Sequence, residues 1–306
     1  NQEVSFGGTS GTLRLRGTSS EGTATGGNDY STITFADDQV KVACTGEIRT
    51  LQNYDNYKTV ETGNARFCRL FEHCEALTSA PALPATTLAD NCYSFMFIGC
   101  TSLVNAPELP ATTLADNCYT YMFNGCTSLV NAPELPATTL AGWCCLYMFG
   151  NCTSLKKAPA LPATTLAVGC YYFMFNKCTS LVDAPELPAT TLADRCYYAM
   201  FYGCSSLVNA PELPATTLAY RCYQYMFYNC KSLTSVTMLA PSGQINNNSF
   251  SAWLYYAGTK DGISRTLKVE DADAYNALKD LETDCLPENW QTGQCTVKDS
   301  KDNPIQ

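Results

Sequence analysis

The chain has 306 residues, of which 46% are apolar, enough for a folded core. Its 19 Lys and Arg against 28 Asp and Glu give a formal net charge of −9, which argues against nucleic acid or an anionic lipid surface as a partner. No apolar run reaches the length of a membrane span, and the first residues lack the layout of a signal peptide, so we expect any export signal to have been removed.

Residues 1–65 contain short alternations of apolar and polar residues and no repeat. Alternation of this kind predicts strands at 12–16, 31–35 and 40–43. The tight link at 36–39 predicts that the last two strands pair as a hairpin. Because a stack of repeats exposes apolar core and unpaired strand edges at its ends, we interpret this region as a β-rich N-terminal cap.

Residues 66–238 repeat with a period of 26 residues. An Ala-Pro pair marks six copies, beginning at Ala80, Ala106, Ala132, Ala158, Ala184 and Ala210. Val236 occupies the next equivalent place, so about seven coils are predicted. A unit of this size cannot bury its own apolar face, and the copies are therefore expected to stack as a solenoid.

Each unit combines a helical and an extended pattern. Leu114, Cys118, Met122 and Cys126 stand four apart, which predicts a short amphipathic helix facing the core. The residue before the second cysteine is mostly of a type that tolerates the left-handed conformation closing a helix, with Lys177 as the exception among Gly99, Gly125, Asn151, Lys177, Gly203 and Asn229. A short strand follows, so the coils are expected to share a parallel sheet with strands about 4.8 Å apart.

Residues 239–306 lose the period and are interpreted as a small α+β C-terminal cap. A strand is predicted at 265–269, and a short helix with an acidic start is predicted at 273–281. The polar tail from Lys298 is expected to be frayed.

Of the 18 cysteines, the twelve that recur in the central repeats are predicted to be buried, reduced thiols. They stand in pairs eight apart, Cys92/Cys100, Cys118/Cys126, Cys144/Cys152, Cys170/Cys178, Cys196/Cys204 and Cys222/Cys230. Within a helix such a pair is about 12 Å apart, beyond the reach of a disulfide. No Cys-x-x-Cys step occurs, so no metal and no cofactor is predicted. Cys285 and Cys295, ten apart, leave a disulfide open.

The repeated units resemble a known family. Met96, Phe97, Cys100 and Leu103, with their counterparts through Leu233, resemble the Phe-x-x-Cys-x-x-Leu core of the BspA-like leucine-rich repeats. This resemblance covers about 67–236. It implies an α/β fold, a right-handed β/α superhelix, and a bacterial surface protein or lipoprotein that adheres to host or microbial surface proteins. Localisation at the cell surface or secretion, with an outer-membrane lipoprotein as one form, follows from the same resemblance.

An enzyme is not predicted, and no catalytic residue is assigned. His73 is the single histidine, so a catalytic triad would depend on it alone. The alternative is a glycan hydrolase using the column Glu108, Glu134, Glu186 and Glu212. A nucleophile and an acid need different environments, whereas positions in a column are equivalent by repetition, which disfavours this alternative.

The preferred interpretation is a monomeric, non-enzymatic module that binds a host or microbial surface protein or a glycan. Stacking turns each outward position into a column of residues. The candidate ligand-binding residues are Arg195, Tyr198, Tyr202, Tyr220, Arg221 and Tyr228, together with the glutamates Glu108, Glu134, Glu186 and Glu212. Two alternatives stay open: a structural spacer without a specific ligand, and tyrosines that merely pack over one another between coils.

Overall fold

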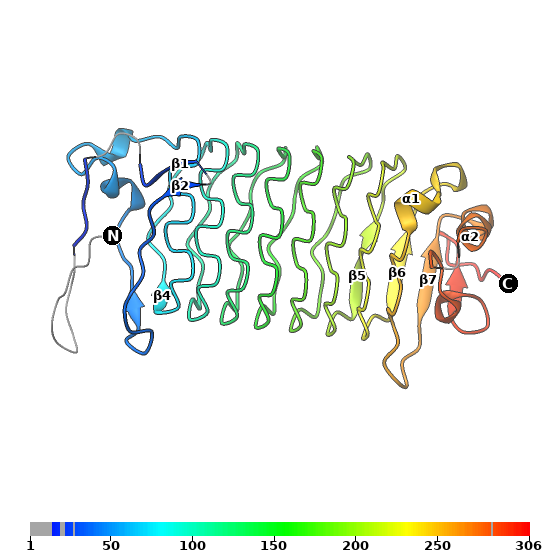
Figure 1. Ribbon diagram of the computed structural model, residues 1–306. Helices are drawn as coiled ribbons and strands as arrows, with labels where there is room; N and C mark the ends of the chain where they lie inside the picture. Colours follow the sequence, from blue (N-terminus) through cyan, green and yellow to red (C-terminus); the bar gives the residue numbers. More distant parts are fainter. Residues whose placement is uncertain (1–13, 19–21, 27, 283) are drawn as a thin grey trace.

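The computed structural model describes residues 14–18, 22–26, 28–282 and 284–306. Its coils lie side by side in one row, with the two ends of the chain at opposite ends of the row (Figure 1). Parallel backbone bridges join the same position of successive coils, through Ser79, Asn105, Asn131, Lys157, Asp183 and Asn209. Each step is 26 residues, so the period of the sequence is the period of the stack.

The predicted amphipathic helices of the repeats are wrong. Within the described residues, α-helix is confined to α1 (Asn247–Phe250) and α2 (Ala272–Lys279), both beyond the repeats. The segment from Asn91 to Gly99 is instead a run of turns in which every fourth residue is left-handed, with φ of 55° at Asn91, 58° at Phe95 and 70° at Gly99. No α-helix accommodates a left-handed residue at every fourth position.

Hydrogen bonds between coils explain why turns replace the helix. The odd-numbered N–H groups from Asn91 to Gly99 donate to carbonyls of the next coil at 2.8–3.1 Å. The even-numbered ones from Cys92 to Cys100 donate to the carbonyl three residues earlier, at 3.1–3.3 Å. A left-handed non-glycine residue costs about 1–2 kcal/mol, and each backbone hydrogen bond contributes about 1 kcal/mol. Stacking therefore offsets a conformation that a single repeat would not adopt.

The left-handed position at the end of the turn run is confirmed in all six coils. Its φ values lie between 56° and 75° at Gly99, Gly125, Asn151, Lys177, Gly203 and Asn229. Lys177 shares this conformation although lysine does not favour it, which shows that the neighbouring coils impose it.

The parallel sheet is less continuous than predicted. In the earlier coils the expected strand is reduced to the single bridged position, because prolines such as Pro107 and Pro110 have no N–H to donate. A four-stranded parallel sheet forms later, from β5 (Asn209–Leu213), β6 (Ser235–Met238), β7 (Thr266–Val269) and β8 (Thr296–Lys298). The segment of β6 contains no proline, which allows ladder pairing such as Leu213 with Met238.

The N-terminal segments add to the stack, and the predicted hairpin of 31–35 with 40–43 is wrong. In the described part of this N-terminal region, the antiparallel pair is instead β1 (Ala24–Gly26) with β2 (Asp29–Tyr30). β3 (Val42–Ala43) pairs in parallel with β4 (Leu77–Ser79), and 31–35 forms no strand. The open backbone edge of the first coil attracts these segments more strongly than they attract each other. Residues 12 and 13 of the first predicted strand lie outside the described residues.

Two short 3-10 helices, η1 (Ile48–Leu51) and η2 (Tyr57–Thr59), follow at this end of the chain. η3 (Ser242–Gln244) and η4 (Glu288–Trp290) lie near the other end.

At the C-terminal end, the predicted strand and helix are present as β7 and α2. The side chain of Asp271 caps α2 by accepting the Ala274 N–H at 2.8 Å. The predicted frayed tail is wrong, because Lys298 and Pro304 form an antiparallel bridge. The turn pattern continues past the visible repeat: the Phe227 N–H donates to the Trp253 carbonyl at 2.8 Å.

The core consists of columns of identical side chains. Seven phenylalanines stack at 5.5–5.7 Å along the whole row, Phe71, Phe97, Phe123, Phe149, Phe175, Phe201 and Phe227. They are fully buried or nearly so. None of the helices in the described ranges is long and apolar enough to cross a membrane.

All 18 cysteines are free thiols, including Cys285 and Cys295, and all but Cys44 and Cys295 are buried. The second cysteine of each unit donates its S–H to a phenylalanine carbonyl of the preceding coil. In the central coil, Cys152 Sγ lies 3.1 Å from the Phe123 carbonyl oxygen. The cysteine pairs of the repeats do not lie in helices, so the distance expected for a helix does not apply to them. The prediction that these cysteines are reduced and buried is confirmed.

Candidate binding surface

A half-exposed aromatic column runs along the turns. Phe95, Tyr121, Tyr147 and Phe173 occupy one of the left-handed positions, and their rings stack at 5.0, 4.8 and 4.6 Å between centroids. Each of these side chains is partly exposed. The stacking hides the ring faces from solvent and leaves the ring edges outward. Arg69 lies over the first ring at 4.2 Å.

The column is interrupted at Ala199, which holds the next left-handed position. Two tyrosines from neighbouring positions turn toward the interruption. Tyr198 packs against Phe173 at 5.5 Å, and Tyr202 packs against the same ring at 6.1 Å, both in tilted geometry. The rings are no longer parallel at this point, so the regular column gives way to an irregular aromatic surface.

This irregular surface continues over the following coils. Tyr202 and Tyr228 stack at 4.6 Å, and Tyr198 meets Tyr225 edge to face at 5.6 Å. Tyr228 then contacts Tyr255 and Tyr256, of which Tyr256 is 52% exposed. We call the group Tyr198, Tyr202, Tyr225, Tyr228, Tyr255 and Tyr256 the tyrosine cluster.

Two arginines adjoin the tyrosine cluster. The guanidinium carbons of Arg195 and Arg221 lie 5.2 and 4.8 Å from the ring centre of Tyr220, which is 39% exposed. The charge of Arg221 also acts on Tyr198, where it lowers the phenol pKa against a larger opposite effect. Among the predicted residues, Tyr198 and Tyr228 are thus linked through Tyr225, and Arg221 lies close enough to Tyr198 for its charge to act on the phenol.

Burial sets the protonation of the tyrosines. It raises the pKa of Tyr198 to about 12, with a further contribution from Tyr172 and Tyr225. Burial likewise raises the pKa of Tyr121 and Tyr147. These phenols therefore remain neutral at physiological pH and offer both a hydrogen-bond donor and an acceptor.

The glutamate column lies on a different part of the coil. Glu108, Glu134, Glu186 and Glu212 are all exposed, three residues after the bridged positions. Beside it, the Asn209 amide donates to the Asp183 carboxylate at 3.1 Å. In the described part of the chain, no ion pair joins these glutamates to Arg195 or Arg221. The structure thus separates the predicted site residues into two groups.

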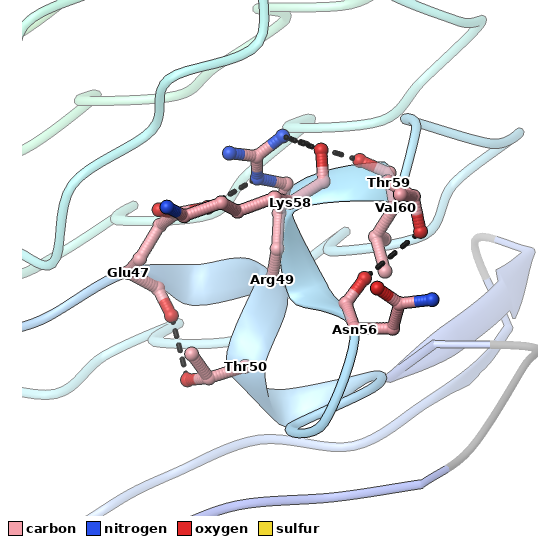
Figure 2. Close-up of polar contacts among 7 residues, drawn as sticks. All are labelled: Glu47, Arg49, Thr50, Asn56, Lys58, Thr59 and Val60. Carbon is pink, nitrogen blue, oxygen red and sulfur yellow. Dashed lines mark hydrogen bonds and ion pairs between the residues drawn. The ribbon is translucent and has the colours of Figure 1, made fainter.

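A third surface feature is an open cleft of about 760 Å³ near the N-terminal end. It is lined by Gly46, Glu47, Thr50, Tyr54, Asp55, Tyr57 and Ala82. Figure 2 shows polar contacts of two lining residues, Glu47 and Thr50: the Arg49 guanidinium pairs with Glu47 and donates to the Lys58 carbonyl at 3.3 Å. Thr50 donates to the Glu47 carbonyl at 2.7 Å (Figure 2).

Among the described residues no three His, Cys, Asp or Glu side chains are close enough to hold a metal ion. His73 is exposed and left-handed, with φ of 55°.

Residues 144–255 match the family model described as BspA type leucine rich repeat region, in six copies. The repeats of this region are BspA-type leucine-rich repeats. Leucine-rich repeats imply a solenoid-like fold, in keeping with the stacked coils of Figure 1. No curated protein and no solved structure matches this BspA-like chain significantly. The matched region contains the two arginines and most of the tyrosine cluster.

Sequence reasoning missed part of the surface of this leucine-rich-repeat protein. Tyr225, Tyr255 and Tyr256 were absent from the predicted set, although they link or extend it. Tyr225 shares the column of Phe95 and Tyr121, so alignment of the repeats contained the signal. Tyr255 and Tyr256 lie where the period is no longer visible in the sequence, and only the continued backbone pairing reveals their place.

Proposed function

We propose that this BspA-like protein is a non-enzymatic binding module that presents repeated columns to a protein or glycan at a cell surface. The tyrosine cluster with Arg195, Tyr220 and Arg221 is the observation that carries the proposal. Large, partly exposed aromatic side chains next to arginines are enriched where proteins bind ligands, because they combine apolar area with hydrogen-bonding groups.

The surface chemistry favours binding over a spacer role. A spacer needs only a solvated exterior, which the repeat supplies elsewhere: the positions of Tyr202 and Tyr228 hold Asn124 and Asn176 in other coils. Tyrosines at these positions in two adjacent coils thus build a local surface that stacking does not require. Tyr198 adds a third ring at the same place.

The proposal includes the organisation predicted from the sequence. It takes residues 1–65 and 239–306 as caps of a right-handed solenoid of about seven coils at 66–238, exported to the cell surface or secreted and acting as a monomer. The resemblance to BspA-like proteins supports the surface location. The exposed glutamate column is a separate candidate site and serves as an internal comparison.

The test is a screen of the purified chain against arrays of glycans and of extracellular matrix and bacterial surface proteins. The double variant Tyr202→Asn/Tyr228→Asn uses the residue that other coils hold at this position, so folding is preserved. We expect saturable binding that the variant weakens at least about tenfold, as loss of aromatic anchors does. The matched control, Glu186→Gln/Glu212→Gln, is expected to keep the affinity of the unchanged chain.

Three outcomes would contradict the proposal. Absence of any saturable ligand favours the spacer, and loss of binding only in the glutamate variant moves the site to the other surface. Turnover of a glycan that is lost in Glu134→Gln would identify a hydrolase.

A further inference from the structure

Arg195 and Arg221 both place a guanidinium group over the ring of Tyr220, at 5.2 and 4.8 Å, on a protein whose formal net charge is −9. We propose that they form a binding site for the oxyanion of an acidic glycan, either a carboxylate or a sulfate ester on the sugar. This inference rests on the proposed binding function and names the ligand class.

Neither guanidinium is neutralised by the protein. Across the described residues, the ion pairs involve Arg49, Arg69 and Lys268, and neither Arg195 nor Arg221 makes a side-chain hydrogen bond. The nearest carboxylate in sequence, Asp194, is engaged with the backbone, because its Oδ1 accepts the Tyr220 N–H at 3.1 Å. Two guanidinium groups therefore remain available for an external anion.

The repeat shows that this arrangement is local. The positions of Arg195 and Arg221 hold Asn91 and Asn117 in the early coils, with the same left-handed backbone. The position of Tyr220 is an aspartate in those coils and in the coil before it: Asp116 Oδ1, for example, accepts the Gly142 N–H at 2.8 Å.

Replacing that aspartate by tyrosine has two effects. It leaves Arg221 without the adjacent carboxylate that Arg195 has in Asp194, and it supplies a ring over which both guanidinium groups lie. The ring and the fixed backbone hold the arginines before a ligand arrives, which lowers the ordering cost of binding. Paired guanidinium groups match the geometry of carboxylate, sulfate and phosphate oxygens.

The neighbouring side chains favour a sugar over a peptide. Peptide anchors insert into apolar pockets, whereas this surface presents tyrosine rings and phenol groups from Tyr198, Tyr202 and Tyr228. Rings accept the C–H face of a sugar, and neutral phenols exchange hydrogen bonds with its hydroxyl groups. The net charge of −9 disfavours densely charged polyanions, including nucleic acids.

The test compares binding of immobilised oligosaccharides of equal length. Hyaluronan carries carboxylates without sulfate, keratan sulfate carries sulfate without carboxylate, and carboxyl-reduced hyaluronan and desulfated keratan are their neutral counterparts. We expect at least one acidic form to bind about tenfold or more tightly than its neutral counterpart, the scale of one charge-assisted hydrogen bond. The arm that binds identifies the carboxylate or the sulfate as the ligand group.

The matched variants assign this preference to the two arginines. Arg195→Asn/Arg221→Asn reproduces Asn91 and Asn117 and is expected to abolish the preference for the acidic form. Lys156→Gln/Lys231→Gln removes the same charge from exposed positions outside the site and is expected to change affinity less than about twofold, because distant surface charges are screened. Tyr220→Phe, which keeps the ring, is expected to retain binding.

The inference is overturned by equal binding of acidic and neutral forms, by an unchanged preference in the arginine variant, or by tighter binding of a tyrosine-sulfated peptide. If array binding is then lost in Tyr202→Asn/Tyr228→Asn but not in the arginine variant, the binding function stands and only the anion site is wrong. If the unchanged chain binds neither these oligosaccharides nor anything on the arrays, both proposals are wrong.

Discussion

Gly125 tests the left-handed backbone at the end of the turn run. Its φ is +75°, and an added Cβ would have its nearest neighbours at 3.6 and 3.7 Å, so space is not the obstacle. In Gly125→Ala, an alanine in the left-handed backbone lowers the free energy of unfolding by about 1–2 kcal/mol. The lower conformational entropy of the unfolded chain offsets about 0.4–1 kcal/mol of this loss. The expected net loss is therefore on the order of 1 kcal/mol. If the backbone of Gly125 had a negative φ, the same change would instead stabilise the protein by about 0.4–1 kcal/mol.

The control is Gly125→Asn, because Asn151 and Asn229 hold the equivalent position with φ of 59° and 60°. We expect this variant to lie within about 0.5 kcal/mol of the unchanged chain, since asparagine tolerates the left-handed region. Equilibrium unfolding in urea measures the three free energies of unfolding. A stabilised Gly125→Ala, or equal losses in both variants, would refute the left-handed turn.

The thiols give two further predictions. Burial raises the pKa of Cys74 to about 11 and of Cys92 to about 12, from 9.0. The contribution of these thiols to the free energy of unfolding should therefore be constant below pH 9 and fall as pH rises from 9 to 12, which urea titrations measure. A free energy of unfolding that does not change with pH in this range would contradict the burial of the thiols. Cys152→Ala removes a buried sulfur and its hydrogen bond to the Phe123 carbonyl, and it is expected to lower the free energy of unfolding by about 1–2 kcal/mol in the same assay. Cys295→Ala, at a half-buried site, should lower it by less than about 0.5 kcal/mol. Equal losses in the two variants would contradict a structural role for the buried thiols of the repeats.

The repeat and its core were predictable because they depend on identity between copies. The 26-residue step fixes which residues align, and burial of Phe97, Met96 and Cys100 follows from their recurrence alone. One unit of the repeat did not contain the information needed to reject the helix. A four-residue spacing of apolar residues fits a helix nearly as well as a run of four-residue turns, and the difference lies in hydrogen bonds to the next coil, which a single unit does not contain.

The candidate surface was also predictable only in part. Tyr198, Tyr202 and Arg221 were found because they depart from the repeat at outward positions. The connection of Tyr198 with Tyr228 through Tyr225 consists of ring contacts between residues of different columns and coils. No single column of the alignment reports such contacts.

The most direct test of the account is hydroxyl-radical footprinting of the chain with a ligand retained in the array screen. The account predicts that oxidation of Tyr198, Tyr202 and Tyr228 slows when the ligand is bound, while Tyr54 and Tyr57 at the N-terminal cleft react as before. Protection of Tyr54 and Tyr57, with unchanged oxidation of the tyrosine cluster, would contradict it.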